Sequence, residues 1–188
     1  MASSPLLIVT ERLVLRPPRA ADAAAVLDLL NDPETIRWNP AAEVVDLASA
    51  EAWCVRAGLW AGGSWETGDH ATWHAVALQD DEFAANVSVF EVDDDHRTAK
   101  VGYRVTAGCR GRGLGTEALR AVTDWAFANL NLARIQLEHA LGNTASCTVA
   151  ERAGYRLEGV LRSAYLDGAG VRHDEHVHGR LATDLPPK

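Results

Sequence analysis

A basic, glycine-rich turn gives the strongest chemical signal in this sequence. Apolar residues at helical spacing follow it as far as Asn129, so it stands at the N-terminus of a predicted helix. Glycines let a ligand approach the backbone, and the first N–H groups of a helix have no partner inside the helix. With the helix dipole and the arginines, the turn predicts a site for the phosphates of an anionic cofactor. Its residues are Cys109, Arg110, Gly111, Arg112, Gly113, Leu114, Gly115 and Thr116.

Two common phosphate-binding motifs do not fit this turn. A P-loop would have a lysine and a hydroxyl residue where this chain has Leu114 and Gly115. A dinucleotide-binding fingerprint would have a third glycine in place of Thr116. The pattern Arg-x-x-Gly-x-Gly at residues 110–115 instead resembles the pyrophosphate loop of the GNAT acetyltransferases. That resemblance implies acetyl-CoA as co-substrate, and an ordinary turn that begins a helix is the alternative.

A second motif lies about 30 residues further along the chain. Asn-x-x-Ser at residues 143–146 is followed by Glu-x-x-Gly-Tyr-x-x-Glu-Gly at residues 151–159. The asparagine is a good N-cap and the first glycine a good helix end, so helix capping alone also accounts for this pattern. With the first motif, however, it resembles the RimJ/RimL-like branch of the GNAT family. Residues 10–17 and 170–174 resemble the opening and closing segments of the same branch, so the resemblance covers nearly the whole chain.

The order of predicted elements indicates one domain over residues 1–188. Three consecutive strands joined by short polar turns precede the glycine turn, which indicates an antiparallel meander and excludes an all-parallel dinucleotide fold. The resemblance implies the GNAT fold, an α/β fold of the α+β type. Its mixed, largely antiparallel central sheet is flanked by helices and splayed between two strands, here 97–105 and 134–140. We expect strands at residues 12–16, 72–79, 83–91, 97–105, 134–140, 155–162 and 171–181, and helices at 20–30, 34–38, 44–61, 114–129 and 144–153.

The resemblance also assigns residues to the cofactor. In GNAT enzymes acetyl-pantetheine lies between the splayed strands and binds main-chain groups of the first, here Tyr103, Arg104 and Val105. A backbone N–H near Val105 would stabilise the oxyanion that forms when an amine attacks the thioester. Asn143 and Ser146 would face the pantetheine arm. Ser146 would give a proton to the departing thiolate, unless it is an exposed helix residue with no such role.

The attacking amine must lose a proton, so the reaction needs a base or a chain of water molecules. Glu138 matches the position of the base glutamate in RimI-like relatives, and the adjacent His139 has a near-neutral intrinsic pKa. Neighbouring strand residues point to opposite faces, so we expect only one of the two to line the cleft, and we favour Glu138. Tyr165 and Asp167 are further candidates near the open end of the cleft.

A run of histidines near the C-terminus raises the question of a metal site. Asp174, His176 and His178 would share one face of a strand, and three such ligands are able to bind a transition metal. Same-face positions on one strand lie roughly 7 Å apart, however, which is too far for a tight tetrahedral site. The sequence therefore predicts a partly exposed strand and no metal.

Composition limits the partners and the location. The net charge of −8 argues against nucleic acid as the main partner and suits a cationic acceptor. Three widely spaced cysteines, Cys54, Cys109 and Cys147, predict no disulfide framework and a reducing cytoplasm. No stretch has the length and apolar character of a membrane span or secretory signal. Apolar residues within 44–71 and the last strand predict a homodimer.

The sequence thus predicts an N-acetyltransferase in which an amine attacks the thioester of acetyl-CoA directly. As acceptor, the RimJ/RimL-like resemblance suggests a protein N-terminal amine, and a small amine such as a polyamine or aminoglycoside is the alternative. An acyl-CoA-binding module with little catalytic activity also stays open, because a cofactor cradle does not by itself require a base.

Overall fold

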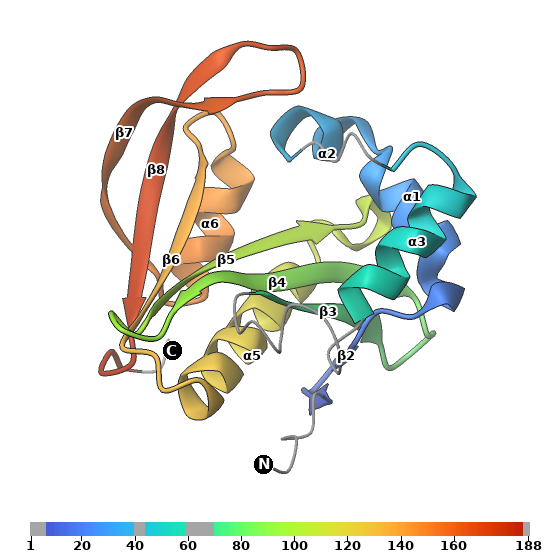
Figure 1. Ribbon diagram of the computed structural model, residues 1–188, viewed down its shortest axis with the longest axis horizontal. Coiled ribbons are helices and arrows are strands. Elements are labelled where there is room, and N and C mark those ends of the chain that lie inside the picture. Colours follow the sequence, from blue (N-terminus) through green and yellow to red (C-terminus); the bar gives the residue numbers. More distant parts are fainter. Residues whose placement is uncertain (1–6, 40–43, 59–69, 186–188) are drawn as a thin grey trace.

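One eight-stranded sheet organises the chain (Figure 1). The computed structural model describes residues 7–39, 44–58 and 70–185. In sequence order the strands are β1 (Ile8–Val9), β2 (Leu13–Arg16), β3 (His70–Ala77), β4 (Phe83–Asp93), β5 (Thr98–Val105), β6 (Arg134–Ala140), β7 (Arg156–Leu166) and β8 (Arg172–Leu181). The helices are α1 (Ala23–Leu30), α2 (Pro33–Trp38), α3 (Leu47–Gly58), α5 (Leu114–Asn129) and α6 (Thr144–Arg152), with 3₁₀ turns η1 (Ala20–Asp22) and η2 (Ala107–Cys109).

The sheet is antiparallel except at its centre. Its order is β1-β2-β3-β4-β5-β6-β8-β7, and β5 and β6 form its parallel pair. That pair extends only from Thr98 to Lys100 on β5 and from Arg134 to Gln136 on β6. Beyond these residues the strands diverge, and β6, β8 and β7 lean away from the rest of the sheet (Figure 1). The predicted mixed sheet and the predicted splay between these two strands are both confirmed.

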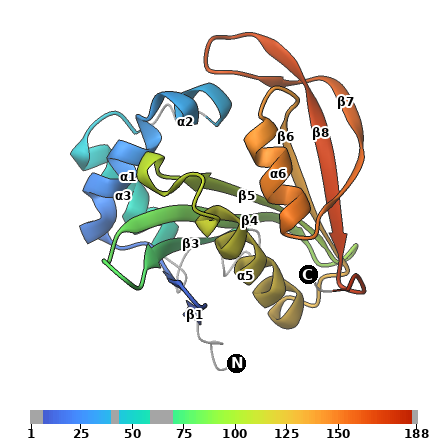
Figure 2. The ribbon, with the colours of Figure 1, turned by 180° about the vertical axis from the view of Figure 1, so that it is seen from behind.

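Helices cover both faces of the sheet. Adjacent residues of β3 demonstrate this, because Trp73 packs edge-on against Trp125 of α5 while His74 stacks on Trp53 of α3. Figure 2 shows α5 and α6 on the near side of the sheet, with α1 and α3 beyond it. The main core lies between the sheet and α5, where Leu119 is fully buried. This core fixes α5, and therefore the glycine turn at its start.

The structure differs from the predicted elements mainly at their ends. The predicted helix at 44–61 begins later, at Leu47, and its last residues lie outside the described part of the chain. The predicted strand 155–162 continues to Leu166, because its hairpin with β8 extends that far. The short β1 was not predicted. None of the described helices has the length and apolar character needed to cross a membrane.

Candidate active site

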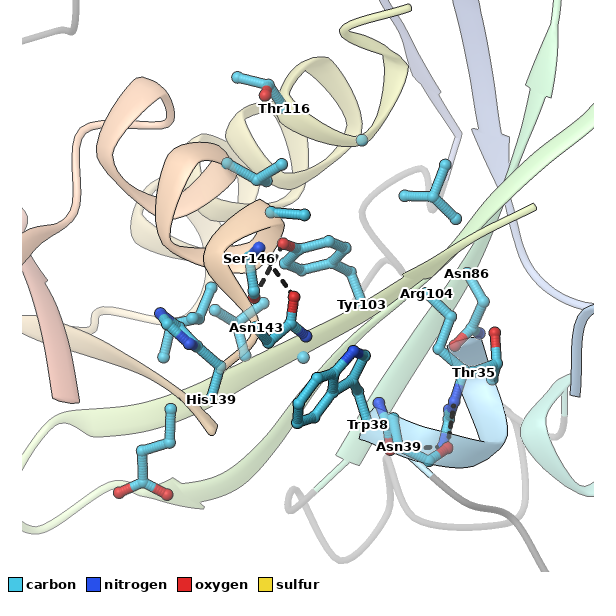
Figure 3. A pocket seen from close by; sticks show the side chains of 18 of the residues that line it. Thr35, Trp38, Asn39, Asn86, Tyr103, Arg104, Thr116, His139, Asn143 and Ser146 are labelled. Atoms are coloured by element: carbon cyan, nitrogen blue, oxygen red, sulfur yellow. Dashed lines mark hydrogen bonds between the residues drawn. The ribbon is translucent and has the colours of Figure 1, made fainter. Parts of the chain in front are cut away.

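A cleft of about 760 Å³ lies where β5 and β6 separate. Residues of β4, β5 and β6 form its floor, and the turn before α5, helix α6 and helix α2 form its walls. Figure 3 shows Tyr103, Asn143 and Ser146 on one side of β5 and Trp38 and Asn39 on the other. The cleft therefore runs through the opening in the sheet and has an end on each face.

The glycine turn lines one end of this cleft. Gly111 and Gly113 have φ angles of 73° and 79°, in the left-handed region that side chains with a Cβ rarely adopt. Gly113 is the N-cap of α5, so the N–H groups that follow it have no carbonyl one turn earlier in the helix. Gly115 and Thr116 also line the cleft. This geometry is that of an anion cradle made of backbone N–H groups.

Gly115 has a second role that the sequence did not indicate. A Cβ at this position would lie 2.7 Å from Cγ2 of Val105. The glycine therefore allows α5 to pack closely on β5, and a larger residue there would push the helix off the strand. Leu114 is buried in the main core, so only its backbone is available to a ligand.

The two arginines of the turn are both paired with carboxylates. Arg110 lines the cleft and forms an ion pair with Asp32, and this hydrogen bond lowers the pKa of Asp32. Arg112 donates to Glu82 at 2.7 Å and is not among the described residues that line the cleft. Part of the positive charge expected at the turn is therefore neutralised, and Arg110 is the arginine whose side chain is available to an anion in the cleft.

A hydrogen-bonded pair of hydroxyls lies in the middle of the cleft. The Tyr103 hydroxyl is 3.0 Å from the Ser146 Oγ, and both residues line the cleft (Figure 3). Burial raises the pKa of Tyr103 to about 12, so the phenol is protonated at neutral pH. Asn143 caps α6, and its Oδ1 accepts a hydrogen bond from the Ser146 N–H at 3.1 Å. Ser146 thus faces the cleft as predicted for a cofactor contact, and it is not an exposed helix residue.

Glu138 and His139 are neighbours on β6, so their side chains point to opposite faces of the sheet. Their partners on β8 are Val177 for Glu138 and His176 for His139. Glu138 and His139 nevertheless both line the cleft. The prediction that only one of them could do so is wrong, since the cleft passes between β5 and β6 and touches both faces.

The surroundings of these two candidates differ. Glu138 accepts a hydrogen bond from Gln136 at 2.7 Å and lies 3.3 Å from the Lys100 ammonium. Across the strand pair, burial and the charge of Glu138 raise the pKa of Glu175. His139 is buried, with its Nδ1 3.0 Å from the Ala140 carbonyl and its Nε2 engaged by another histidine. Glu138 is thus the more accessible of the two.

The other end of the cleft includes Glu34, Asn39 and Glu175, which the sequence did not indicate. Arg104 donates to the Asn39 side chain at 2.8 Å and so joins β5 to the end of α2. The Trp38 indole donates to Glu34 at 3.1 Å, and its ring lies against Gly142. Glu34, Glu138 and Glu175 line this end with Trp38 and Tyr165, and these three carboxylates outnumber the cations Arg104 and Lys100, of which Lys100 is paired with Glu138. An acidic and aromatic lining suits a cationic group. Asp167 instead accepts from His173 at 2.8 Å, outside this lining.

Comparison with known proteins identifies a family. Residues 12–156 match the acetyltransferase (GNAT) domain. The chain is 34% identical over 101 residues to a Bacillus subtilis (strain 168) protein named "Putative ribosomal N-acetyltransferase YdaF", in a match that spans 53% of this chain and 54% of that protein. The chain thus spans about half the length of this relative. It is also 26% identical to the N-acetyltransferase p20 of Bacillus licheniformis, over 82% of this chain and 85% of that one.

A solved structure extends the similarity to the fold. Mycobacterium smegmatis RimJ, determined in complex with CoA-disulfide, superposes with a TM-score of 0.79 at 29% sequence identity. The superposition covers 93% of this chain and 84% of RimJ. The splayed sheet and the helices around it are therefore shared over almost the full described chain.

Proposed function

Because this chain belongs to the GNAT family of acetyltransferases, which use acetyl-CoA and in which no metal is indicated, we propose that it acetylates the N-terminal amine of a protein. The observation that carries the proposal is one continuous cleft with an anion cradle at one end and an acidic, aromatic lining at the other. The name of the YdaF relative, which contains the word ribosomal, supports a protein as acceptor, and the similarity to RimJ agrees with the RimJ/RimL-like resemblance of the sequence.

The cofactor would lie along the cleft with its pyrophosphate on the glycine turn. The N–H groups that follow Gly113, with the side chain of Arg110, would bind the pyrophosphate. Its pantetheine arm would pass along the edge of β5 from which β6 has diverged. There it would meet main-chain groups of residues 103–105, and a backbone N–H near Val105 would stabilise the oxyanion.

The transfer itself needs two proton movements. An ammonium at the acidic end would give one proton to Glu138, directly or through water, and its lone pair would then attack the thioester carbon. As the tetrahedral intermediate collapses, the carbon–sulfur bond breaks and the sulfur of CoA becomes a thiolate. The amide nitrogen would pass its second proton to that thiolate through water and the hydroxyl pair of Tyr103 and Ser146, so that CoA leaves as a thiol and both hydroxyls keep their protons.

Thiol release from acetyl-CoA tests this proposal. We expect turnover with short peptides that have a free N-terminal amine, and little with the same peptides after N-terminal acetylation. Spermidine and an aminoglycoside serve as small-amine competitors. Faster turnover with either of these would replace the peptide acceptor by a small amine, and an absence of turnover with every amine, despite measurable CoA binding, would favour a binding module.

We also propose that residues 1–188 act as one domain in the cytoplasm and form a homodimer. Within residues 44–71, Val44 is buried and Trp53 is half-buried against the rest of the chain. Leu47 and Val55 are 55% and 47% exposed and remain available, whereas residues 59–69 lie outside the described part of the structure. A sedimentation mass near 20.3 kDa that does not change on dilution would contradict the dimer.

A further inference from the structure

Four side chains from three elements converge on the face of the sheet that α6 covers. They are His139 of β6, Cys147 of α6, and His176 and His178 of β8. The strand register produces this arrangement, because His139 stands opposite His176, and Leu137 opposite His178. One potential ligand atom from each residue lies within 4.8 Å of all the others.

Two distances in the cluster are close to those of a tetrahedral metal site, and the other ligand atoms lie within 4.8 Å of one another. Zinc bonds of about 2.0 Å to nitrogen and 2.3 Å to sulfur place two nitrogens roughly 3.3 Å apart and a nitrogen and a sulfur roughly 3.6 Å apart. Here the Nε2 atoms of His139 and His178 are 3.1 Å apart, and the Cys147 Sγ is 3.8 Å from the His178 Nε2. We propose that these four residues bind one transition-metal ion, with Zn²⁺ the preferred ion for three imidazoles and a thiolate.

The hydrogen bonding of His139 favours ligation. The His139 Nδ1 lies 3.0 Å from the Ala140 carbonyl, so this nitrogen carries the proton and Nε2 presents its lone pair to the cluster. In metal sites, such a bond to the outer nitrogen orients the imidazole. A neutral imidazole carries one N–H, and that of His139 is on Nδ1. Without an ion, only His178 could therefore supply a proton between the two facing Nε2 atoms.

Burial supports the same assignment. His139 and His178 are 6% and 0% exposed, so both imidazoles are shielded from water. The His176 Nδ1 is buried, and no described residue forms a hydrogen bond with it. The Cys147 Sγ donates to the Glu151 carboxylate at 3.8 Å, and binding of the ion would release this proton.

The proposed site is closed, since four protein ligands leave no coordination position for substrate, and closed sites of this kind are structural. It would fasten α6 to β6 and β8. Cys147 directly follows Ser146, which lines the acetyl-CoA cleft, so the ion would stiffen the wall against which the pantetheine arm lies. When the ion is bound, the Nε2 lone pair of His139 would be engaged, and this histidine could not act as the base.

Cobalt substitution of the full chain, with any purification tag removed, tests the proposal. We expect Co²⁺ to produce the strong visible absorption of tetrahedral coordination and a thiolate-to-cobalt charge-transfer band, with one ion per chain. Zn²⁺ should displace the cobalt and abolish both features. Wild-type protein without these bands would overturn the site, whatever its variants do.

Single substitutions assign the ligands. Cys147→Ser should remove the charge-transfer band, and both Cys147→Ser and His176→Gln should weaken Zn²⁺ affinity at least about 100-fold, since loss of an outer-shell contact alone costs about 10- to 100-fold. His96→Gln is the matched control, because His96 is exposed, pairs with Asp93 and lies between β4 and β5, outside the cluster. Circular dichroism of the apo variants separates loss of a ligand from loss of the fold. Wild-type affinity in folded Cys147→Ser and His176→Gln would contradict the assignment.

Discussion

The two ends of the cleft are built in different ways. The cradle end comes from one continuous turn, and its properties belong to the backbone, namely the left-handed angles at Gly111 and Gly113 and the N-terminus of α5. The acceptor end is assembled from side chains of α2, β6, β7 and β8. A site made of backbone groups keeps its affinity for the same ligand when neighbouring side chains are substituted. A site made of side chains changes its ligand preference with each substitution. We therefore expect cofactor binding and acceptor chemistry to respond to separate mutations.

The largest expected effect is at the acceptor end. Glu138→Gln should lower kcat/KM by roughly 10²- to 10⁴-fold, because the amide keeps the shape of the carboxylate but accepts no proton. The dissociation constant for CoA, measured by calorimetry, should stay the same. Glu51→Gln, an exposed substitution on α3, is the control. Equal activity of the two variants would mean that water and positioning are sufficient for proton removal.

A smaller effect is expected at the cradle end. Gly113→Ala should raise the KM for acetyl-CoA about 10-fold with little change in kcat, because a Cβ at a left-handed position costs about 1–2 kcal/mol and shifts the first N–H groups of α5. Gly170→Ala is a close control, since this glycine has the same φ of 79° but lies in the turn between β7 and β8. The two variants should lose similar thermal stability. An equal change in KM would show that strain, and not the cradle, is responsible.

The hydroxyl pair lies between the two ends and should give a weaker effect. Tyr103→Phe removes the hydrogen bond to Ser146, and the loss of about 1 kcal/mol should lower kcat about fivefold. If the two hydroxyls act as a unit, Tyr103→Phe in a Ser146→Ala background should add little to the loss caused by Ser146→Ala alone. Steady-state kinetics of the three variants checks this, and fully multiplicative losses would mean that the hydroxyls act independently.

A hydrogen-bonded cluster of Arg16, Asp22 and His74 lies outside the cleft lining, so substitutions in it should affect stability alone. Hydrogen bonds from Arg16 and His74, at 2.6 and 2.7 Å, outweigh the effect of burial and hold the pKa of Asp22 well below its usual value. Burial lowers the pKa of His74 in the folded protein. As pH falls, this histidine is therefore protonated in the unfolded chain before it is protonated in the folded protein. The stability due to neutral His74 is therefore present above pH 6.5 and is lost below it, and that due to Asp22 is lost at lower pH.

Thermal melts between pH 7.5 and about pH 5 measure this linkage. The melting temperature of the wild-type protein should fall over this range, and His74→Gln should fall less steeply because it cannot take up the proton. His96→Gln, an exposed substitution, should follow the wild type. Parallel slopes for His74→Gln and the wild type would assign the acid sensitivity to other groups, such as His139 and His178.

The contrast between the two ends also explains what the sequence could predict. The glycine turn and Asn143 with Ser146 are local patterns, and the elements that hold them fell where periodicity and capping residues indicated. The contact of Arg104 with Asn39 joins residues 65 positions apart, and no local pattern encodes it. The histidine cluster was missed for a similar reason. The distance argument for a single strand was sound, but β6 and α6 contribute the other two side chains of the cluster, and the register of β6 with β8 brings His139 to His176.

The three-residue pairing of β5 with β6 has a consequence for how the molecule responds to its co-substrate. Beyond Lys100, β6 forms no backbone pairs with β5, so three residue pairs join the two parts of the sheet. Beside this junction, α5 packs on β5 and α6 packs on β6. A pantetheine arm in the gap would act as a replacement strand and complete the ladder. Amide hydrogens of residues 101–105 that exchange with deuterium in the free protein should then become protected when CoA is bound, and the two parts of the sheet should unfold as one cooperative unit.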